Sequence, residues 1–180
     1  MTTRTNDPQG NRARLLRAAT DLLGSQGLAA LTLDEVARVA GSSKGGLLHH
    51  FPNKQALLIG IVQERIDAFT TLLQTMLADE PAAVRGRWAR AYVRASFAAE
   101  ADVFSANGAL VLSVLADPAL LVYFNQAICF APPDDDGLPP GRLALIRMTC
   151  DGMWITELTD KPFAPAVRTA MQDELLRLTR

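Results

Sequence analysis

The sequence predicts an all-α protein of about nine helices: three short ones, a long one, and five more. Apolar side chains recur every three or four residues through the long segments, which is the spacing of one buried face of a helix. No segment alternates apolar and polar residues convincingly, as a half-buried strand does. Glycine, proline and capping residues divide the chain into lengths typical of helices.

The composition favours a cytoplasmic protein with a substantial core. Of 180 residues, 49% are apolar and 21% are charged, as in ordinary globular proteins. The longest apolar runs fall far short of the roughly 20 residues that span a membrane, so no membrane partner is expected. The polar N-terminus does not read as a secretory signal. Cys129 and Cys150 stand in apolar surroundings, which favours buried free thiols in a reducing compartment.

The charge is unevenly distributed along the chain. Residues 1–54 carry a net charge of +3, whereas the remainder carries −4. A basic segment on an acidic body is typical of a protein that binds a polyanion at one end.

The first segment reads as an arm followed by a helix. Residues 1–10 are polar and lack periodicity, so we expect a disordered arm. From residue 11, leucine and alanine recur at helical spacing, and Gly24 and Gly27 are expected to end this helix. Three arginines, Arg12, Arg14 and Arg17, lie near its start.

The stretch LTLDEVARVAGSSKGGLLHHF, residues 31–51, reads as a helix, a tight turn and a second helix. Thr32 and Glu35 have the spacing of a capping box, in which each side chain bonds the other residue's backbone amide. Gly41 can adopt the left-handed conformation that ends a helix. Ser42 or Ser43 then caps the second helix, and Pro52 disfavours helix at Phe51. The buried face of the first helix is expected to comprise Val36, Val39 and Ala40.

The remaining helices follow from the same signals. Asn53 caps a long helix over 54–78, and Pro81 suits the first position of a helix over 81–99. Further helices are expected over 102–116, 117–131, 142–158 and 164–178, with a proline-rich loop over 132–141. This organisation divides the chain into an arm (1–10), a helix-turn-helix domain (11–53) and a larger helical domain (54–180).

Two adjacent glycines mark the second helix of the turn motif. Each glycine costs a helix about 1 kcal/mol relative to alanine. Gly45 and Gly46 would let a groove wall or a phosphate backbone approach the helix closely. The alternative is that they belong to a loop.

The segment TLDEVARVAGSSKGGLLHHFPNKQALL resembles the DNA-binding segment of the TetR family of bacterial repressors. The resemblance covers about residues 11–60. It implies a three-helix DNA-binding domain followed by a ligand-binding and dimerisation domain. The matching positions are Thr32, Val36-Ala37, Ala40-Gly41, Ser43, Gly45, Leu47, His50-Phe51, Lys54 and Leu57.

The resemblance implies a role for each DNA-binding position. Thr32 would contact a phosphate, as would Lys54, and His50 would lie near the DNA backbone. The start of the recognition helix favours anions. Leu48 stands where a tyrosine is frequent in the family, so a hydrogen bond to phosphate would be lost and an apolar contact becomes possible. The helix start comprises Ser42, Ser43, Lys44 and Gly45, and the groove-facing positions are Gly46 and His49.

The larger domain is expected to hold a ligand. DGMW at residues 151–154 is loosely similar to TetR regulators that sense cationic or drug-like compounds. Apolar pockets with few polar anchors bind such molecules, although plain core packing is the default reading for each aromatic residue. The candidate ligand contacts are Trp88, Tyr92, Phe97, Phe104, Asn107, Phe124, Asp151 and Trp154.

Other site chemistries find little support. Adjacent His49 and His50 point about 100° apart on a helix and cannot share a metal ion. The acidic run 134–136 reads as a solvated turn. No nucleophile–base arrangement, cofactor motif or metal-ligand spacing is present, so we expect no enzyme, cofactor or metal.

The predicted function is a ligand-responsive repressor. As a homodimer through its last two helices, it would bind a pseudo-palindromic double-stranded DNA operator. A small lipophilic or drug-like effector in the second domain would release it. The alternative is a constitutive DNA-binding dimer without a small-molecule effector.

Overall fold

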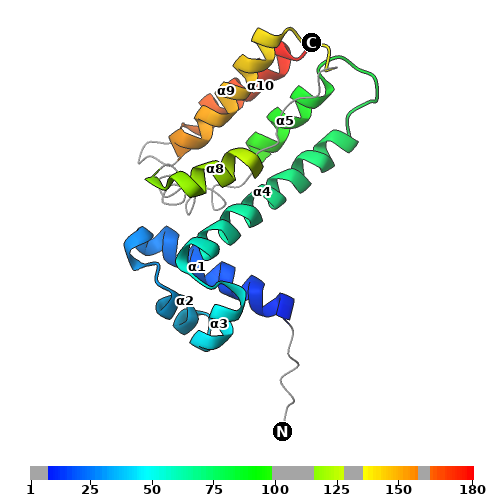
Figure 1. Ribbon diagram of the computed structural model, residues 1–180. Helices are drawn as coiled ribbons and strands as arrows, with labels where there is room; N and C mark the ends of the chain where they lie inside the picture. Colours follow the sequence, from blue (N-terminus) through cyan, green and yellow to red (C-terminus); the bar gives the residue numbers. More distant parts are fainter. Residues whose placement is uncertain (1–7, 99–115, 128–135, 158–162) are drawn as a thin grey trace. The chain divides into compact units, whose positions relative to one another are not determined.

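The computed structural model describes residues 8–98, 116–127, 136–157 and 163–180 (Figure 1). Within these ranges the chain forms eight helices and no strand, which confirms the all-α prediction. None of these helices has both the length and the apolar character needed to cross a membrane. The helices are α1 (Pro8–Ala30), α2 (Leu33–Val39), α3 (Lys44–His50), α4 (Lys54–Ala78), α5 (Arg87–Ala98), α8 (Pro118–Ala127), α9 (Pro140–Glu157) and α10 (Pro165–Leu178).

The chain separates into two compact units. The first comprises residues 1–64 and 109–126, and the second comprises residues 65–108 and 127–180. The division falls inside α4, which is one continuous helix. The assignment of DNA binding to 11–53 and of ligand binding and dimerisation to 54–180 stays a prediction, because compactness does not test function.

The core of the first unit is built largely from leucine, as the helical spacing predicted. Helices α1, α2 and α3 contact one another, and the start of α4 contributes a further row of buried side chains. Removing these side chains from water drives the packing, at about 25 cal/mol per Å² of apolar surface. The fully buried members include Leu15, Leu16, Leu23, Leu31, Val36, Leu47, Leu57 and Ile61.

Helix α1 differs from its predicted bounds at both ends. It begins at Pro8, inside the predicted arm, because proline suits the first position of a helix. Residues 1–7 of that arm lie outside the described residues. Gly24 does not end the helix, whereas Gly27 interrupts it with φ 77° and ψ −179°. This φ is accessible to glycine at little cost.

One residue of the predicted buried face of α2 is exposed. Val36 and Ala40 are buried as expected, but Val39 is 44% exposed and Ala37 is buried instead. Val36, Ala37 and Ala40 form one arc of a helix, while Val39 lies at its flank.

In the second unit, α5, α9 and α10 contact one another in pairs. Ile146 and Met153 of α9 are fully buried. Helix α9 begins at Pro140, inside the predicted loop, and the prediction of a helix from Pro81 is wrong. Residues 81–86 form turns in which Ala83 and Gly86 have φ of 61° and 71°, so the helix begins only at Arg87. The predicted helix over 102–116 falls almost wholly outside the described residues.

Glu80 joins the end of α4 to α5. Its side chain is 3% exposed and accepts hydrogen bonds from Arg90 Nε at 2.8 Å and from Arg94. Arg90 also donates to the carbonyls of Arg85 and Thr179. Because each buried charge meets an opposite charge or a carbonyl, this cluster links the α4–α5 turn to the end of α10 without leaving the carboxylate unpaired.

Candidate functional site

The turn between α2 and α3 has the backbone geometry that the sequence predicted. Gly41 has φ 60°. Its amide donates to the Arg38 carbonyl, and the Ser42 amide donates to the Ala37 carbonyl. These two bonds form a Schellman motif, which satisfies the last carbonyls of α2.

Thr32 caps α2, but the reciprocal half of the predicted capping box is replaced. Thr32 Oγ1 accepts a hydrogen bond from the Glu35 amide at 3.2 Å. The Glu35 carboxylate instead accepts from Arg38 Nε at 2.9 Å, and this bond lowers the pKa of Glu35. The Thr32 amide donates to the Ala30 carbonyl.

Helix α3 begins at a serine cap. Ser43 Oγ accepts from the Gly46 amide at 3.0 Å, which selects Ser43 over Ser42 as the N-cap and excludes the loop reading of Gly45 and Gly46. A Cβ on Gly46 would lie 3.1 Å from Ser42 Oγ and 3.2 Å from Ser43 Oγ. A Cβ on Gly45 would meet no atom within 4 Å. The absence of a side chain at Gly46 therefore leaves space for the two serine hydroxyls, whereas a side chain at position 45 would meet no neighbouring atom.

Lys44 pairs with an acidic residue that the sequence did not single out. Its Nζ lies 2.9 Å from Asp34 Oδ1 and 3.1 Å from Oδ2. The two side chains are 61% and 69% exposed, so the pair contributes little to folding. No sequence signal indicated Asp34, because the turn decides which residue of α2 faces Lys44.

The outer face of α3 is exposed and its inner face is anchored. Leu47 is fully buried, whereas Leu48 is 38% exposed and His49 is exposed as well. Of the two predicted groove-facing positions, His49 is therefore exposed and Gly46 is half-buried. Leu48 adds an apolar side chain to the outer face.

The two remaining residues predicted to contact DNA, Lys54 and His50, have polar contacts within the protein. Lys54 Nζ donates to the Leu28 carbonyl at 2.9 Å, near the end of α1. His50 Nε2 lies 3.4 Å from Asn11 Nδ2. An ammonium has three donors, so the bond to Leu28 leaves Lys54 donors for a phosphate.

Three predicted ligand contacts come together in the second unit. The rings of Trp88 and Tyr92 stack with centroids 4.8 Å apart, and Phe69 meets Tyr92 edge-on at 5.7 Å. Tyr92 Oη donates to Asp151 Oδ1 at 2.6 Å. Burial, followed by the negative charge of Asp151, raises the pKa of Tyr92, so the phenol keeps its proton and remains a donor.

The other predicted ligand contacts are not brought to this cluster. The Phe97 ring lies 5.7 Å from the Arg168 guanidinium, which also donates to the Phe97 carbonyl. Phe104 and Asn107 lie outside the described residues, as do the side chains of Phe124 and Trp154.

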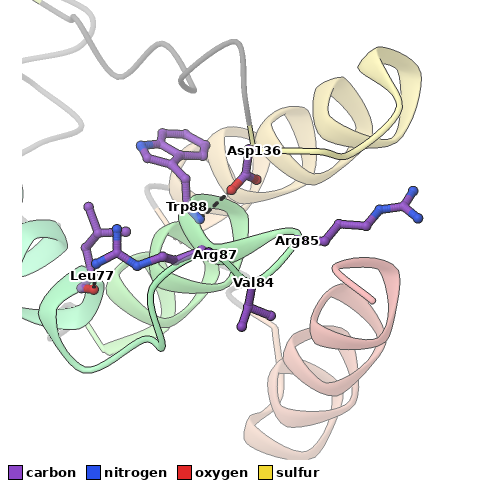
Figure 2. A pocket seen from close by; sticks show the side chains of 7 residues that line it. Leu77, Val84, Arg85, Arg87, Trp88 and Asp136 are labelled. Carbon is purple, nitrogen blue, oxygen red and sulfur yellow. Dashed lines mark hydrogen bonds between the residues drawn. The ribbon is translucent and has the colours of Figure 1, made fainter.

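A pocket of about 230 Å³ lies beside Trp88. Figure 2 shows Asp136 bonded to the backbone of Trp88, while Arg85 extends away from the other lining residues. The pocket is smaller than the roughly 300–1,000 Å³ typical of drug-sized ligands. Arg87 donates to the Leu77 and Glu80 carbonyls, so this guanidinium serves the fold. The lining residues are Leu77, Ala83, Val84, Arg85, Arg87, Trp88 and Asp136.

The prediction that the acidic run 134–136 is a solvated turn is wrong for Asp136. It is buried, and its carboxylate accepts from the Trp88 amide at 2.6 Å and from the Ala89 amide at 3.2 Å. An anion is favoured at these free amides at the start of α5. The other two acidic residues of the run, 134 and 135, lie outside the described residues.

Cys150 is a free, fully buried thiol, as predicted. Burial raises the pKa of Cys150 to about 12, which suppresses the reactive thiolate at neutral pH. Cys129 lies outside the described residues. Within the part of the chain that the structure describes, no group of three or more His, Cys, Asp or Glu side chains could hold a metal ion.

Comparison with known protein families identifies the family of this helix-turn-helix protein. Residues 15–61 match the family described as bacterial regulatory proteins, tetR family. Residues 86–180, just over half of the chain, match the tetracyclin repressor-like C-terminal domain. This chain belongs to the TetR family. The TetR match covers α2 and α3 together with parts of α1 and α4.

Curated TetR-type relatives match over part of their length. The HTH-type transcriptional regulator RutR of Escherichia coli is 29% identical over 109 residues, which is 60% of this chain and 50% of RutR. EthR of Mycobacterium tuberculosis is 35% identical over 81 residues, or 44% of this chain and 37% of EthR. The chain thus spans about half or less of the length of these relatives.

Solved structures share the TetR fold over almost the entire chain. A putative transcriptional regulator from Pseudomonas aeruginosa superposes with a TM-score of 0.72 at 19% identity, covering 97% of this chain and 93% of that one. The multidrug binding protein EbrR complexed with malachite green superposes with a TM-score of 0.67 at 23% identity, covering 94% and 98%. At these identities the likeness establishes the fold alone.

Proposed function

We propose that this TetR-family protein is a transcriptional repressor that acts in the cytoplasm by binding a double-stranded DNA operator through α3. The carrying observation is the geometry of the α2–α3 unit. Ser43 caps α3 and Leu47 anchors it, while Lys44 at its first position and His49 on the side opposite Leu47 are exposed. A helix held in this way and exposed along one side suits insertion into a major groove.

A homodimer would bring two such helices to one operator. Helices α9 and α10 leave apolar side chains exposed in the single chain, with Leu145, Met148 and Val167 at 54%, 73% and 46%. These two helices would pack against the same pair in a second copy, because isologous contact covers one apolar surface with another. The operator would then be pseudo-palindromic, with half-sites in successive major grooves.

The effector would be a small lipophilic or drug-like molecule in the second unit. The stacked Trp88 and Tyr92 rings beside the Asp151 carboxylate have the chemistry that attracts a lipophilic cation. EbrR, a structural neighbour, has been seen with malachite green and with ethidium. The Asp151 carboxylate would supply the anchor and the aromatic rings the apolar contacts.

Helix α4 would transmit the signal. It is continuous from Lys54, which bonds to Leu28 in the first unit, to Leu77, whose carbonyl accepts from Arg87 in the second. Bound ligand would stabilise one position of α4, and bound DNA would stabilise a different position. The coupling equals the difference in ligand affinity between these two states.

Replacing Lys44 with alanine tests DNA binding. The variant should bind operator about fivefold more weakly at 0.15 M salt, with a salt dependence flatter by about 0.9 per protomer, because one phosphate contact is lost. Operator fragments selected from random duplex DNA would be titrated by fluorescence anisotropy at several salt concentrations. Arg85→Ala removes the same charge from an exposed turn outside the proposed DNA and dimer interfaces and should change neither quantity. Equal behaviour of the two variants would refute the assignment of α3 to DNA.

The response to ligand separates the repressor from a constitutive DNA-binding dimer. Saturating ethidium or malachite green should raise the melting temperature by roughly 5 °C and release operator. Trp88→Ala should reduce both responses while operator binding persists without dye. Circular dichroism would follow melting, and anisotropy would follow release. A panel of cationic and neutral lipophilic compounds that changes neither quantity would favour the constitutive dimer.

A further inference from the structure

The start of α1 meets the end of α3 through contacts that join residues far apart in the sequence. Asn11 Nδ2 lies 3.4 Å from His50 Nε2, across 39 positions. Arg14 Nη2 donates to Asn11 Oδ1 at 2.8 Å. The Arg12 guanidinium lies 5.4 Å from the centre of the Phe51 ring. All of these residues belong to the first compact unit.

These contacts fix the orientation of Asn11. Its oxygen accepts from Arg14, so its amide nitrogen faces His50 and donates. The tautomer of His50 that carries its proton on Nδ1 can accept this bond at Nε2. Asn11 therefore favours the tautomer in which Nδ1 is the ring nitrogen that can donate to a ligand.

The same contacts leave a concentrated positive charge at the end of the recognition helix. Residues 8–20 contain three arginines and no acidic residue. The side chains of Arg12, Arg14 and Arg17 are exposed, and none forms an ion pair within the described part of the chain. Phe51 is buried and supports the Arg12 guanidinium by one face, which leaves its N–H edges free to donate.

We propose that Arg12 and Arg14 bind DNA phosphates beside the groove that α3 enters, with Asn11 positioning His50 in the same interface. The proposal rests on the proposed function of α3. The chemistry favours phosphate because guanidinium presents paired donors that match its oxygens. The DNA interface then extends from α3 onto α1. The two arginines of α1 add positive charge to it, whereas Asp34 partly neutralises the charge of Lys44.

The two arginines are tested by their effect on salt dependence. Arg12→Gln and Arg14→Gln should each flatten the dependence of log K on log salt by about 0.9 per protomer. Each should weaken binding to selected operator duplex about fivefold at 0.15 M salt, and the double variant about 30-fold. Arg85→Gln, in the exposed turn before α5, is the control and should leave slope and affinity unchanged. Circular dichroism melting of each variant would verify that it folds.

Asn11→Ala tests positioning separately from charge. This variant keeps every positive charge, so its salt dependence should match that of the unmodified chain. Its preference for operator over calf thymus DNA should fall several-fold, because His50 loses its fixed orientation. An unchanged preference would overturn the role of Asn11.

The outcomes distinguish this proposal from the function on which it rests. Unchanged slopes for Arg12→Gln and Arg14→Gln, beside a flatter slope for Lys44→Ala, would overturn the extended interface and leave α3 as the DNA-binding helix. Failure of the unmodified chain to enrich any duplex sequence would overturn both. Flatter slopes in all three variants would support the extended interface.

Discussion

Replacing Gly86 with alanine is expected to destabilise the second unit by about 3 kcal/mol or more. Gly86 has φ 71°, where alanine pays roughly 1–2 kcal/mol. An alanine Cβ would also lie 2.1 Å from the Thr179 carbonyl oxygen, so the backbone at the end of α10 must move. That movement would disturb the Gly86 amide, which donates to the Asp136 carbonyl at 2.7 Å.

Urea unfolding followed by tryptophan fluorescence measures this loss selectively. Both tryptophans, Trp88 and Trp154, belong to the second unit. Gly152→Ala is a matched control inside α9, where an added Cβ meets no atom within 4 Å. It should stabilise the helix by about 0.5–1 kcal/mol. Midpoints that move by the same amount in both variants, at equal protomer concentration, would contradict the steric argument.

Replacing Glu80 with glutamine is expected to cost about 3 kcal/mol, or roughly 150-fold in the folding equilibrium. The substitution keeps the shape of the side chain but removes its negative charge. Arg90, whose side chain is 14% exposed, and Arg94 then lose their counter-charge. The cost arises mainly from leaving the partly buried charge of Arg90 without a counter-charge, because its bonds to the Arg85 and Thr179 carbonyls supply none.

Glu174→Gln is the control for Glu80→Gln. Glu174 pairs with Arg177 on α10, and these side chains are 59% and 64% exposed. Solvent screens such a pair, so its loss should cost about 0.5 kcal/mol or less. The same fluorescence-detected urea titration compares the two variants. A shift in the unfolding midpoint no larger for Glu80→Gln than for Glu174→Gln would show that the buried cluster contributes nothing beyond a surface pair.

Local features of the site were predictable from the sequence. Thr32, Gly41, Ser43 and Asn53 were each expected at a helix end, and each lies at one. These features depend on residues within three or four positions of one another, so local hydrogen bonding and backbone conformation are sufficient to specify them. The family match to residues 15–61 confirms the resemblance that the sequence showed over residues 11–60.

The sequence predictions were wrong where a residue distant in the sequence determines where a helix begins or which of its faces is buried. The predicted helix from Pro81 does not form, because Asp136 caps the amides of Trp88 and Ala89 instead. Val39 was expected in the core, but the packing of α2 buries Ala37. Neither outcome follows from local spacing, because each depends on which element lies opposite.

The sequence by itself determined the helical class, the helix ends at Thr32, Gly41, Ser43 and Asn53, and the family of the helix-turn-helix in residues 31–51. The tertiary structure alone decided that Lys44 faces Asp34, that Tyr92 donates to Asp151 across 59 positions, and that Asn11 reaches His50. The physical reason is the range of the interactions. A cap or a turn is closed by neighbouring residues, whereas these pairs form only after separate helices pack and bring their side chains within hydrogen-bonding distance.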